Sequence, residues 1–149
     1  MRRLINQILI NDVCSRFVAP LRVGGAVVFW AAVCCIEVLA VPVKQWDKCF
    51  GGRGDDQAYA IQQTRDGGYI VAGTSTSGAE GDKTEASRGA KDYWIVKMDG
   101  NGSKQWNKRF GGSGDDEAKA IQQTSDGGYV VAGYSQSGAD GDKTEDSRG

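Results

Sequence analysis

The sequence has no histidine among its 149 residues. This absence excludes Ser-His-Asp and Cys-His catalysis, histidine-ligated zinc and the usual protonation switch near neutral pH. The sequence also lacks an excess of either charge, since 18 basic residues face 19 acidic residues and the formal net charge is -1. A protein without a basic field has no general attraction to nucleic acid, so we expect no nucleic-acid partner.

Proline is scarce as well, with 2 residues, whereas glycine is abundant, with 22. A disordered glycine-rich linker would lack aromatic side chains, yet this chain has 4 Trp, 5 Tyr and 4 Phe. Beyond residue 43 no stretch has the apolar i, i+3, i+4, i+7 spacing of an amphipathic helix. The composition therefore predicts an all-β protein of short strands and tight turns.

The first 43 residues differ in composition from the rest of the chain. They carry arginines ahead of a run of 14 uncharged residues at 23–36, followed by the small-residue pattern Val38-x-Ala40. This order is typical of a secretory signal peptide with cleavage after Ala40. We therefore predict a leader at 1–43 and a secreted or cell-surface location.

Two alternatives stay open for this segment. A retained N-terminal transmembrane helix over residues 23–43 would bury Glu37 in the bilayer, at a cost on the order of a few kcal/mol. A mis-assigned start of the chain is the other alternative, because 22 residues precede the run, which is long for a signal peptide. After cleavage Cys49 would be the single cysteine, so we expect no disulfide and a half-buried strand position for Cys49.

Residues 44–149 contain an internal repeat with a period of 60 residues. The stretch at 44–89 returns at 104–149 without a gap, and 35 of its 46 positions are identical. A gapless repeat of this similarity means that one structural unit has been copied. We divide this part into a repeat at 44–103 and a partial repeat at 104–149.

Within one period the pattern predicts four short strands, at 58–64, 69–73, 93–98 and 104–110. Tight hairpin turns are predicted at 65–68 and 99–102, because Asp-Gly pairs accept the positive φ that such turns require. In the third strand Trp94, Val96 and Met98 share one face, and in the fourth Trp106 and Phe110 share one face. Two further predictions are a lone fourth strand at 44–50 and a strand pair within 118–135.

Four antiparallel strands per period, with apolar residues on both faces, predict the four-stranded blades of a β-propeller. A sandwich or a β-solenoid is the alternative, although solenoid rungs repeat every ~20–30 residues and need no two hairpin turns per period. The predicted fold is thus an all-β propeller fragment of about one and three-quarter repeats, preceded by the hydrophobic leader.

Three strings in the repeat carry a resemblance to a known family. They are Lys-Gln-Trp-Asn-Lys-Arg-Phe-Gly-Gly-Ser-Gly-Asp-Asp, Ile-Gln-Gln-Thr-x-Asp-Gly-Gly-Tyr-x-Val-Ala-Gly and Asp-Tyr-Trp-Ile-Val-Lys-Met-Asp. Over residues 44–149 the chain resembles the delta-sixty-type β-propeller repeats of bacterial secreted and surface proteins. The resemblance implies a multi-blade extracellular propeller, often one module of a longer surface protein and generally without an assigned enzymatic activity.

The number of repeats departs from that family, whose arrays contain many, whereas this chain contains fewer than two. A closed propeller needs about four to eight blades, and isolated repeats cannot bury both faces. The sequence therefore predicts a fragment of a longer protein. Further repeats, or other copies of the chain assembled into one ring, would be needed to close it.

Candidate metal ligands lie in the two glycine-rich stretches, where Asp55, Asp56, Asp115 and Asp116 follow Gly-Gly-x-Gly. These stretches match the opening of the calcium β-roll nonapeptide, which requires stacking every nine residues, whereas here they recur every 60. Calcium is therefore a hypothesis, and the alternative is a loop whose Asp side chains hydrogen-bond the turn backbone. No catalytic residue and no other cofactor is predicted.

Ligand binding is predicted at the long loop 78–89 and its copy at 138–149, which present both charge signs on a rigid scaffold. The alternative is a solvated connector held by local ion pairs. We expect a non-enzymatic binding or scaffolding module with a protein or glycan ligand at these loops. The other reading is a propeller enzyme, hydrolase or quinoprotein-like, whose active-site blades are missing from this chain.

Overall fold

The computed structural model describes residues 44–148; the predicted leader at 1–43 and the last residue, Gly149, lie outside the described residues. The described part contains six strands in two antiparallel sheets and no helix. Over these residues, then, the structure offers no helix long and apolar enough to cross a bilayer. The prediction of an all-β, antiparallel fold is confirmed.

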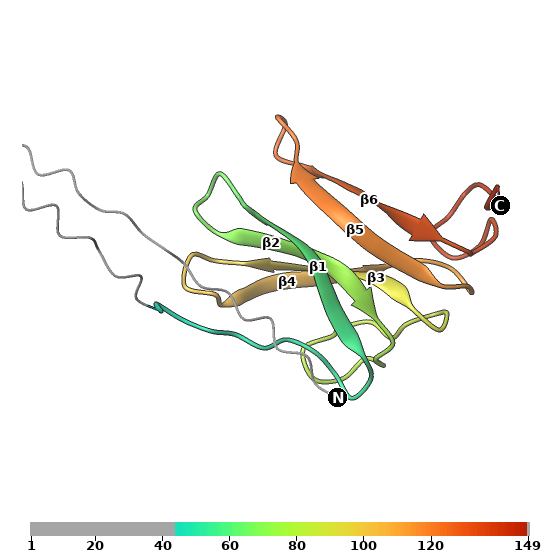
Figure 1. Ribbon diagram of the computed structural model, residues 1–149, viewed down its shortest axis with the longest axis horizontal. Helices are drawn as coiled ribbons and strands as arrows, with labels where there is room; N and C mark the ends of the chain where they lie inside the picture. Colours follow the sequence, from blue (N-terminus) through green and yellow to red (C-terminus); the bar gives the residue numbers. More distant parts are fainter. Residues whose placement is uncertain (1–43, 149) are drawn as a thin grey trace, which may run out of the picture. The chain divides into compact units, whose positions relative to one another are not determined.

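The first sheet has four strands in chain order, each antiparallel to its neighbours (Figure 1). They are β1 (Asp56–Gln63), β2 (Tyr69–Ser75), β3 (Asp92–Met98) and β4 (Lys104–Phe110). The four strands predicted from the sequence agree with these bounds to within two residues. β2 and β3 are central in the sheet, and they hold the β-branched and aromatic residues that favour a strand covered on both faces.

The second sheet pairs β5 (Asp116–Gln123) with β6 (Tyr129–Ser135). Its register repeats that of β1 and β2 one period later, including a β-bulge between Ala118 and Ala120. The two bulged residues meet across the sheets, where Lys119 Nζ lies 3.6 Å from the ring centroid of Tyr59. This is a cation–π distance. The sequence repeat is therefore a repeat of backbone register as well.

Short turns join the strands at one end of the sheets, which we call the turn end. In the β1–β2 turn Gly67 has a φ of +78°, and in the β5–β6 turn its counterpart Gly127 has a φ of +91°. Only glycine adopts this conformation without strain, which explains the predicted Asp-Gly turns. The opposite end, the loop end, carries the long connections at 51–55, 76–91, 111–115 and 136–148.

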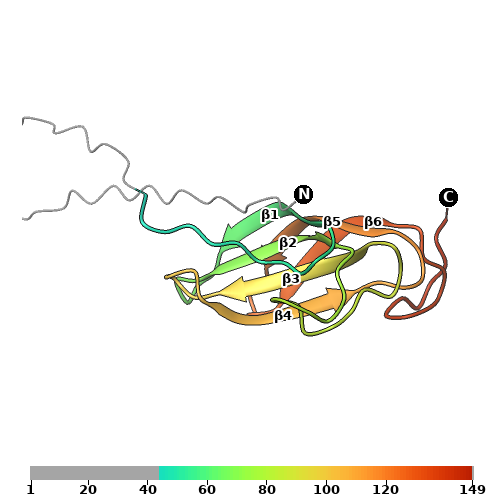
Figure 2. The same cartoon turned by 90° about the horizontal axis from the view of Figure 1, so that it is seen from below.

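One face of the first sheet packs against the second sheet. Ile70, Ala72 and Ile95 form a buried cluster with Ala118 of β5, and none of the four is more than 2% exposed. Residues packed around this cluster are Tyr93, Ile121, Tyr129 and Val131. As a result β5 lies against β1, β2 and β3 (Figure 2).

The other face of the first sheet is covered by the segment that precedes β1. Phe50 lines a space of only about 10 Å³ together with Val71 of β2 and Trp94 and Val96 of β3. Trp94 and Val96 are 5% and 1% exposed. β2 and β3 are thus buried on both faces, as their apolar composition requires.

The prediction of a strand at 44–50 is wrong, because this segment is irregular. It contacts the sheet through side chains: the Trp46 ring meets Tyr69 edge-on with centroids 5.8 Å apart, and Trp46 Nε1 donates to the Gly100 carbonyl at 3.2 Å. The counterpart of this segment, β4, is a strand because it pairs with β3. Cys49 is exposed rather than half-buried in a strand.

Equivalent positions in the two repeats should differ strongly in their contribution to stability. Ile70 is 0% exposed and its counterpart Val130 is 53% exposed. We expect Ile70→Ala to lower the free energy of unfolding by about 2–5 kcal/mol, because it leaves a cavity in the core. Val130→Ala, the matched control, should change it by less than about 0.5 kcal/mol. Urea unfolding followed by circular dichroism measures both, and equal losses would contradict the packing.

Acid should weaken the turn end through Asp66. The carboxylate accepts hydrogen bonds from Lys97 Nζ at 2.8 Å, from the Thr64 hydroxyl and from the Gly68 amide, and these hold the pKa of Asp66 well below its ordinary 3.8. A carboxyl group with a lowered folded-state pKa stabilises the fold above its unfolded-state pKa, and this stabilisation is lost as the pH falls toward the folded value.

The expected result is a melting temperature lower in Asp66→Asn than in the unsubstituted chain at pH 7, with the difference shrinking below about pH 4. Asp126→Asn is the control, because Asp126 has Thr124 and Gly128 as partners but no lysine. It should have the smaller effect at pH 7. A pH-independent difference for Asp66→Asn would count against the ion pair.

Candidate functional site

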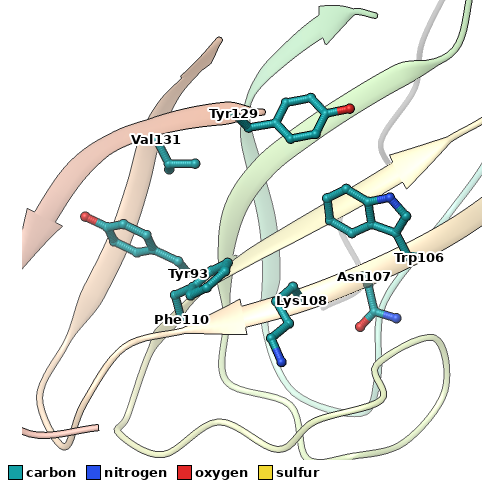
Figure 3. A pocket seen from close by; sticks show the side chains of 7 residues that line it. All are labelled: Tyr93, Trp106, Asn107, Lys108, Phe110, Tyr129 and Val131. Carbon is teal, nitrogen blue, oxygen red and sulfur yellow. The ribbon is translucent and has the colours of Figure 1, made fainter. Parts of the chain in front are cut away.

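An apolar cleft of about 640 Å³ lies between the two sheets. Trp106 and Phe110 of β4 form one wall, and Tyr129 and Val131 of β6 form the other (Figure 3). Tyr93 of β3 lies beside Phe110. The Trp106 and Tyr129 rings meet edge-on with centroids 5.9 Å apart. The cleft therefore offers aromatic and aliphatic contact area, which suits binding by shape and apolar burial.

The side-chain amide and the ammonium group that line this cleft, from Asn107 and Lys108, already have partners. The Asn107 amide oxygen accepts the Trp94 indole N–H at 3.1 Å and the Thr84 amide at 3.2 Å. Lys108 Nζ lies 2.6 Å from Glu85, and this hydrogen bond is the main reason that the pKa of Glu85 is lowered. These groups frame the cleft without presenting an unpaired acid or base.

Beyond Phe110 the cleft continues at the loop end into a smaller cavity of about 230 Å³. We call it the polar cavity, because charged and polar residues join the aromatic ones in its lining. Its polar lining consists of Gly111, Asp116, Ser135, Asp142 and Lys143. Tyr93 and Phe110 line both cavities, so the apolar and polar parts form one continuous surface along β6.

Two buried carboxylates meet at Gly111, and one of them, Asp116, lines the polar cavity. Asp92 and Asp116 are 0% and 1% exposed. A Cβ at Gly111 would collide with an oxygen of each, and the φ of +151° also requires glycine there. Burial raises the pKa of Asp92 and the charge of Asp116 adds to this, while hydrogen bonds from the Arg88 and Gly89 amides oppose it. Burial likewise raises the pKa of Tyr93.

The predicted calcium candidates Asp56 and Asp116 are used inside their own loops. Asp56 Oδ2 accepts the Gly52 amide and the Ser77 hydroxyl, both at 2.8 Å. Asp116 makes the same two bonds one period later, at 2.9 and 2.7 Å. This is the arrangement of an Asp side chain that satisfies a turn backbone.

The other two candidates, Asp55 and Asp115, take part in the same loops through their backbone. Their carbonyls accept the amides of Thr76 at 2.9 Å and Gln136 at 2.8 Å. Within residues 44–148 no group of three or more His, Cys, Asp or Glu side chains is arranged to hold a metal ion. Among the described residues the four carboxylates therefore do not form a common cluster.

The first predicted binding loop, at 78–89, is folded around a buried lysine. Lys83 is 4% exposed, and its Nζ donates to Ser75 Oγ at 2.8 Å and to Ser77 O and Ser87 Oγ at 3.0 Å. Burial lowers the pKa of Lys83. These bonds fix the loop backbone, so the loop is ordered.

The second loop, at 138–149, repeats this construction over its described residues. Lys143 Nζ donates to Ser137 O at 2.6 Å and to Ser147 Oγ at 3.1 Å. Arg88 of the first loop reaches this repeat, with Nη1 3.1 Å from Asp142 Oδ2 and 3.3 Å from Gly111 O. Each repeat thus presents the same ordered loop at the loop end.

Sequence reasoning missed the cleft and the buried lysine. Trp106 and Phe110 are correctly predicted to share a face of their strand, but the sequence does not say that β6 stands opposite them. The signal that could have identified Lys83 is its recurrence as Lys143 within Gly-Asp-Lys-Thr in the second loop.

The chain matches no protein-family model and no curated protein. The chemistry open to the site follows from its own side chains. These provide an apolar cleft with a polar end, and ordered loops that recur once per repeat.

Calcium binding at the glycine-rich stretches can be tested directly. Because Asp56 and Asp116 already accept two hydrogen bonds each within their loops, we expect millimolar calcium to leave the melting temperature unchanged relative to chelator. Differential scanning calorimetry of the full chain measures this, with magnesium as the control cation. A calcium-specific rise that is lost in Asp115→Asn would instead support the sequence-based hypothesis.

Proposed function

We propose that this chain is a non-enzymatic repeat module of the delta-sixty-type β-propeller kind, secreted or displayed at a cell surface, which scaffolds and binds. Stacked repeats would form the scaffold, and the loop end would hold a protein or glycan ligand. Such a module needs adjacent repeats that pack face to face and loops whose form does not depend on a ligand.

The observation that carries the proposal is that both repeats build the loop end with the same hydrogen bonds. In each repeat an Asp oxygen accepts an amide and a serine hydroxyl, and a lysine ties the long loop to serine groups. The two repeats therefore place the same residue types at equivalent positions of the loop end. An enzyme would instead need several unlike groups to converge on one point.

Packing between the repeats supports the scaffold part of the proposal. Ala118 of β5 is 0% exposed against Ile70, Ala72 and Ile95 of the first sheet. Arg88 of the first repeat lies 3.1 Å from Asp142 of the second. Apolar burial and charged contacts between successive units are the interactions that hold repeat proteins together.

The binding part of the proposal predicts that ligand binding weakens when side chains of the loop end are replaced. The labelled full chain is applied to an array of neutral, sialylated and sulfated glycans and to purified collagen, fibronectin and laminin. We expect retention on at least one class, weakened about tenfold in the double variant Arg53→Ala/Arg148→Ala. This variant removes loop-end charges that are 92% and 89% exposed and whose partners, Glu80 and Glu145, lie within the same repeat.

Arg65→Ala is the matched control, because Arg65 is an exposed arginine at the turn end. It should bind as the unsubstituted chain does. Failure of the folded chain to bind any of these probes, or equal weakening by Arg65→Ala, would contradict a ligand site at the loop end.

A further inference from the structure

We propose that the edge of β6 and the cleft beside it form an acceptor site for one β-strand with the side-chain pattern of β3. The occupant is the third strand of a further copy of the repeat, with Asp, Trp, Val and Met at alternate positions. This inference rests on the proposed repeat-scaffold function and names the partner of its second sheet.

The open edge of β6 is the first observation. β6 and β2 have identical residues at five of seven positions. β2 pairs with β1 on one side and with β3 on the other, and all seven of its residues are buried. Within the described residues β6 pairs with β5 alone, and none of its residues is buried. An unpaired strand edge of this kind is a template for a further strand.

The size of the cleft is the second observation, because the first repeat shows the same place filled. Phe50 and Val71 are the counterparts of Phe110 and Val131, and between them only about 10 Å³ remain free. Trp94 and Val96 of β3 line that residual space and fill the rest. In the second repeat no such side chains are present among the described residues, and about 640 Å³ stand open (Figure 3).

The polar end of the cleft is the third observation. In the first repeat Lys83 Nζ lies 6.0 Å from the centroid of the Trp94 ring, and the negative charge of Asp92 favours the protonated form of this lysine. Its counterpart Lys143 lines the open 230 Å³ cavity beside Ser135. An Asp and a Trp two positions apart on an added strand would give Lys143 the surroundings that Lys83 has.

The tryptophan at each repeat start is the fourth observation. Trp46 packs on Tyr69 and gives its indole N–H to the Gly100 carbonyl in the β3–β4 turn. Trp106 packs on Tyr129 with nearly the same geometry. Its indole N–H has no acceptor in the described part of the chain, which a turn following the added strand would supply.

These observations also fix the register of the added strand. In the first sheet Met98 stands opposite Tyr69, Val96 opposite Val71, Trp94 opposite Gly73 and Asp92 opposite Ser75. One period later the facing residues are Tyr129, Val131, Gly133 and Ser135. Three of these, Tyr129, Val131 and Ser135, line the open cavities.

A second copy of this chain cannot supply β3 itself, because β3 is already paired with β2 and β4 along its length. The probe is therefore a synthetic peptide of residues 91–103, Lys-Asp-Tyr-Trp-Ile-Val-Lys-Met-Asp-Gly-Asn-Gly-Ser. It contains the strand and the turn carbonyl. The labelled peptide is titrated with the full chain and followed by fluorescence anisotropy, with sedimentation to count peptides per chain.

We expect saturable binding of one peptide per chain. A peptide with Trp94→Ser and Val96→Ser should bind at least about tenfold more weakly, because it loses the side chains that fill the cleft. The chain variant Val131→Lys should weaken binding by a similar factor, since it places a charge in the cleft. Val130→Lys is the matched control on the opposite face of β6, where the side chain is 53% exposed, and should bind within about twofold of the unsubstituted chain.

Circular dichroism first establishes that both chain variants keep the β-sheet signal. The proposal is overturned if the folded chain does not bind the peptide, if the doubly substituted peptide binds equally well, or if Val131→Lys behaves as Val130→Lys does. Self-association of the chain that the peptide cannot reverse would also overturn it. Loop-end binding on the glycan and protein arrays involves other residues, so either proposal can fail while the other stands.

Discussion

The structure depends on the need to cover both faces of β2 and β3. These strands carry large apolar side chains on both sides, with Ile70 and Ile95 toward the second sheet and Val71, Trp94 and Val96 toward the segment before β1. A sheet of this composition exposes too much apolar surface when it stands alone. Neighbours on both sides are therefore a condition of the fold, and here β5 covers one face while the segment before β1 covers the other.

The loop end is subject to a second constraint, because charged and polar groups are buried there away from water. Lys83, Asp92 and Asp116 are each at most 4% exposed. Hydrogen bonds offset part of the cost of this burial. The serines at 75, 77 and 87 accept hydrogen bonds from the lysine. Asp92 and Asp116 each accept through Oδ2, while their Oδ1 atoms have no hydrogen-bond partner among the described residues. The same polar network fixes the long loops without a hydrophobic core of their own.

The two repeats show how neighbours, rather than residue types, decide what is exposed. Tyr69 is 6% exposed in the first repeat, whereas its counterpart Tyr129 is only partly buried and lines the open cleft. Ile70 and Val130 differ even more, at 0% and 53%. Local sequence and backbone register are nearly the same in both places. The difference arises because β2 has β3 beside it and β5 packed on its Ile70 face, whereas β6 has neither kind of neighbour within residues 44–148.

The strands, the short turns and the repeat follow from the local sequence. Alternating apolar residues and Asp-Gly pairs act over a few neighbours, so β1 to β6 and Gly67 could be placed without tertiary information. Contacts between distant segments account for the irregular path of 44–50, the inward direction of Asp56 and Asp116, and the cleft between β4 and β6. The physical reason is that a strand forms only where another strand completes its hydrogen bonds, and a cleft exists only where packing brings two distant walls together.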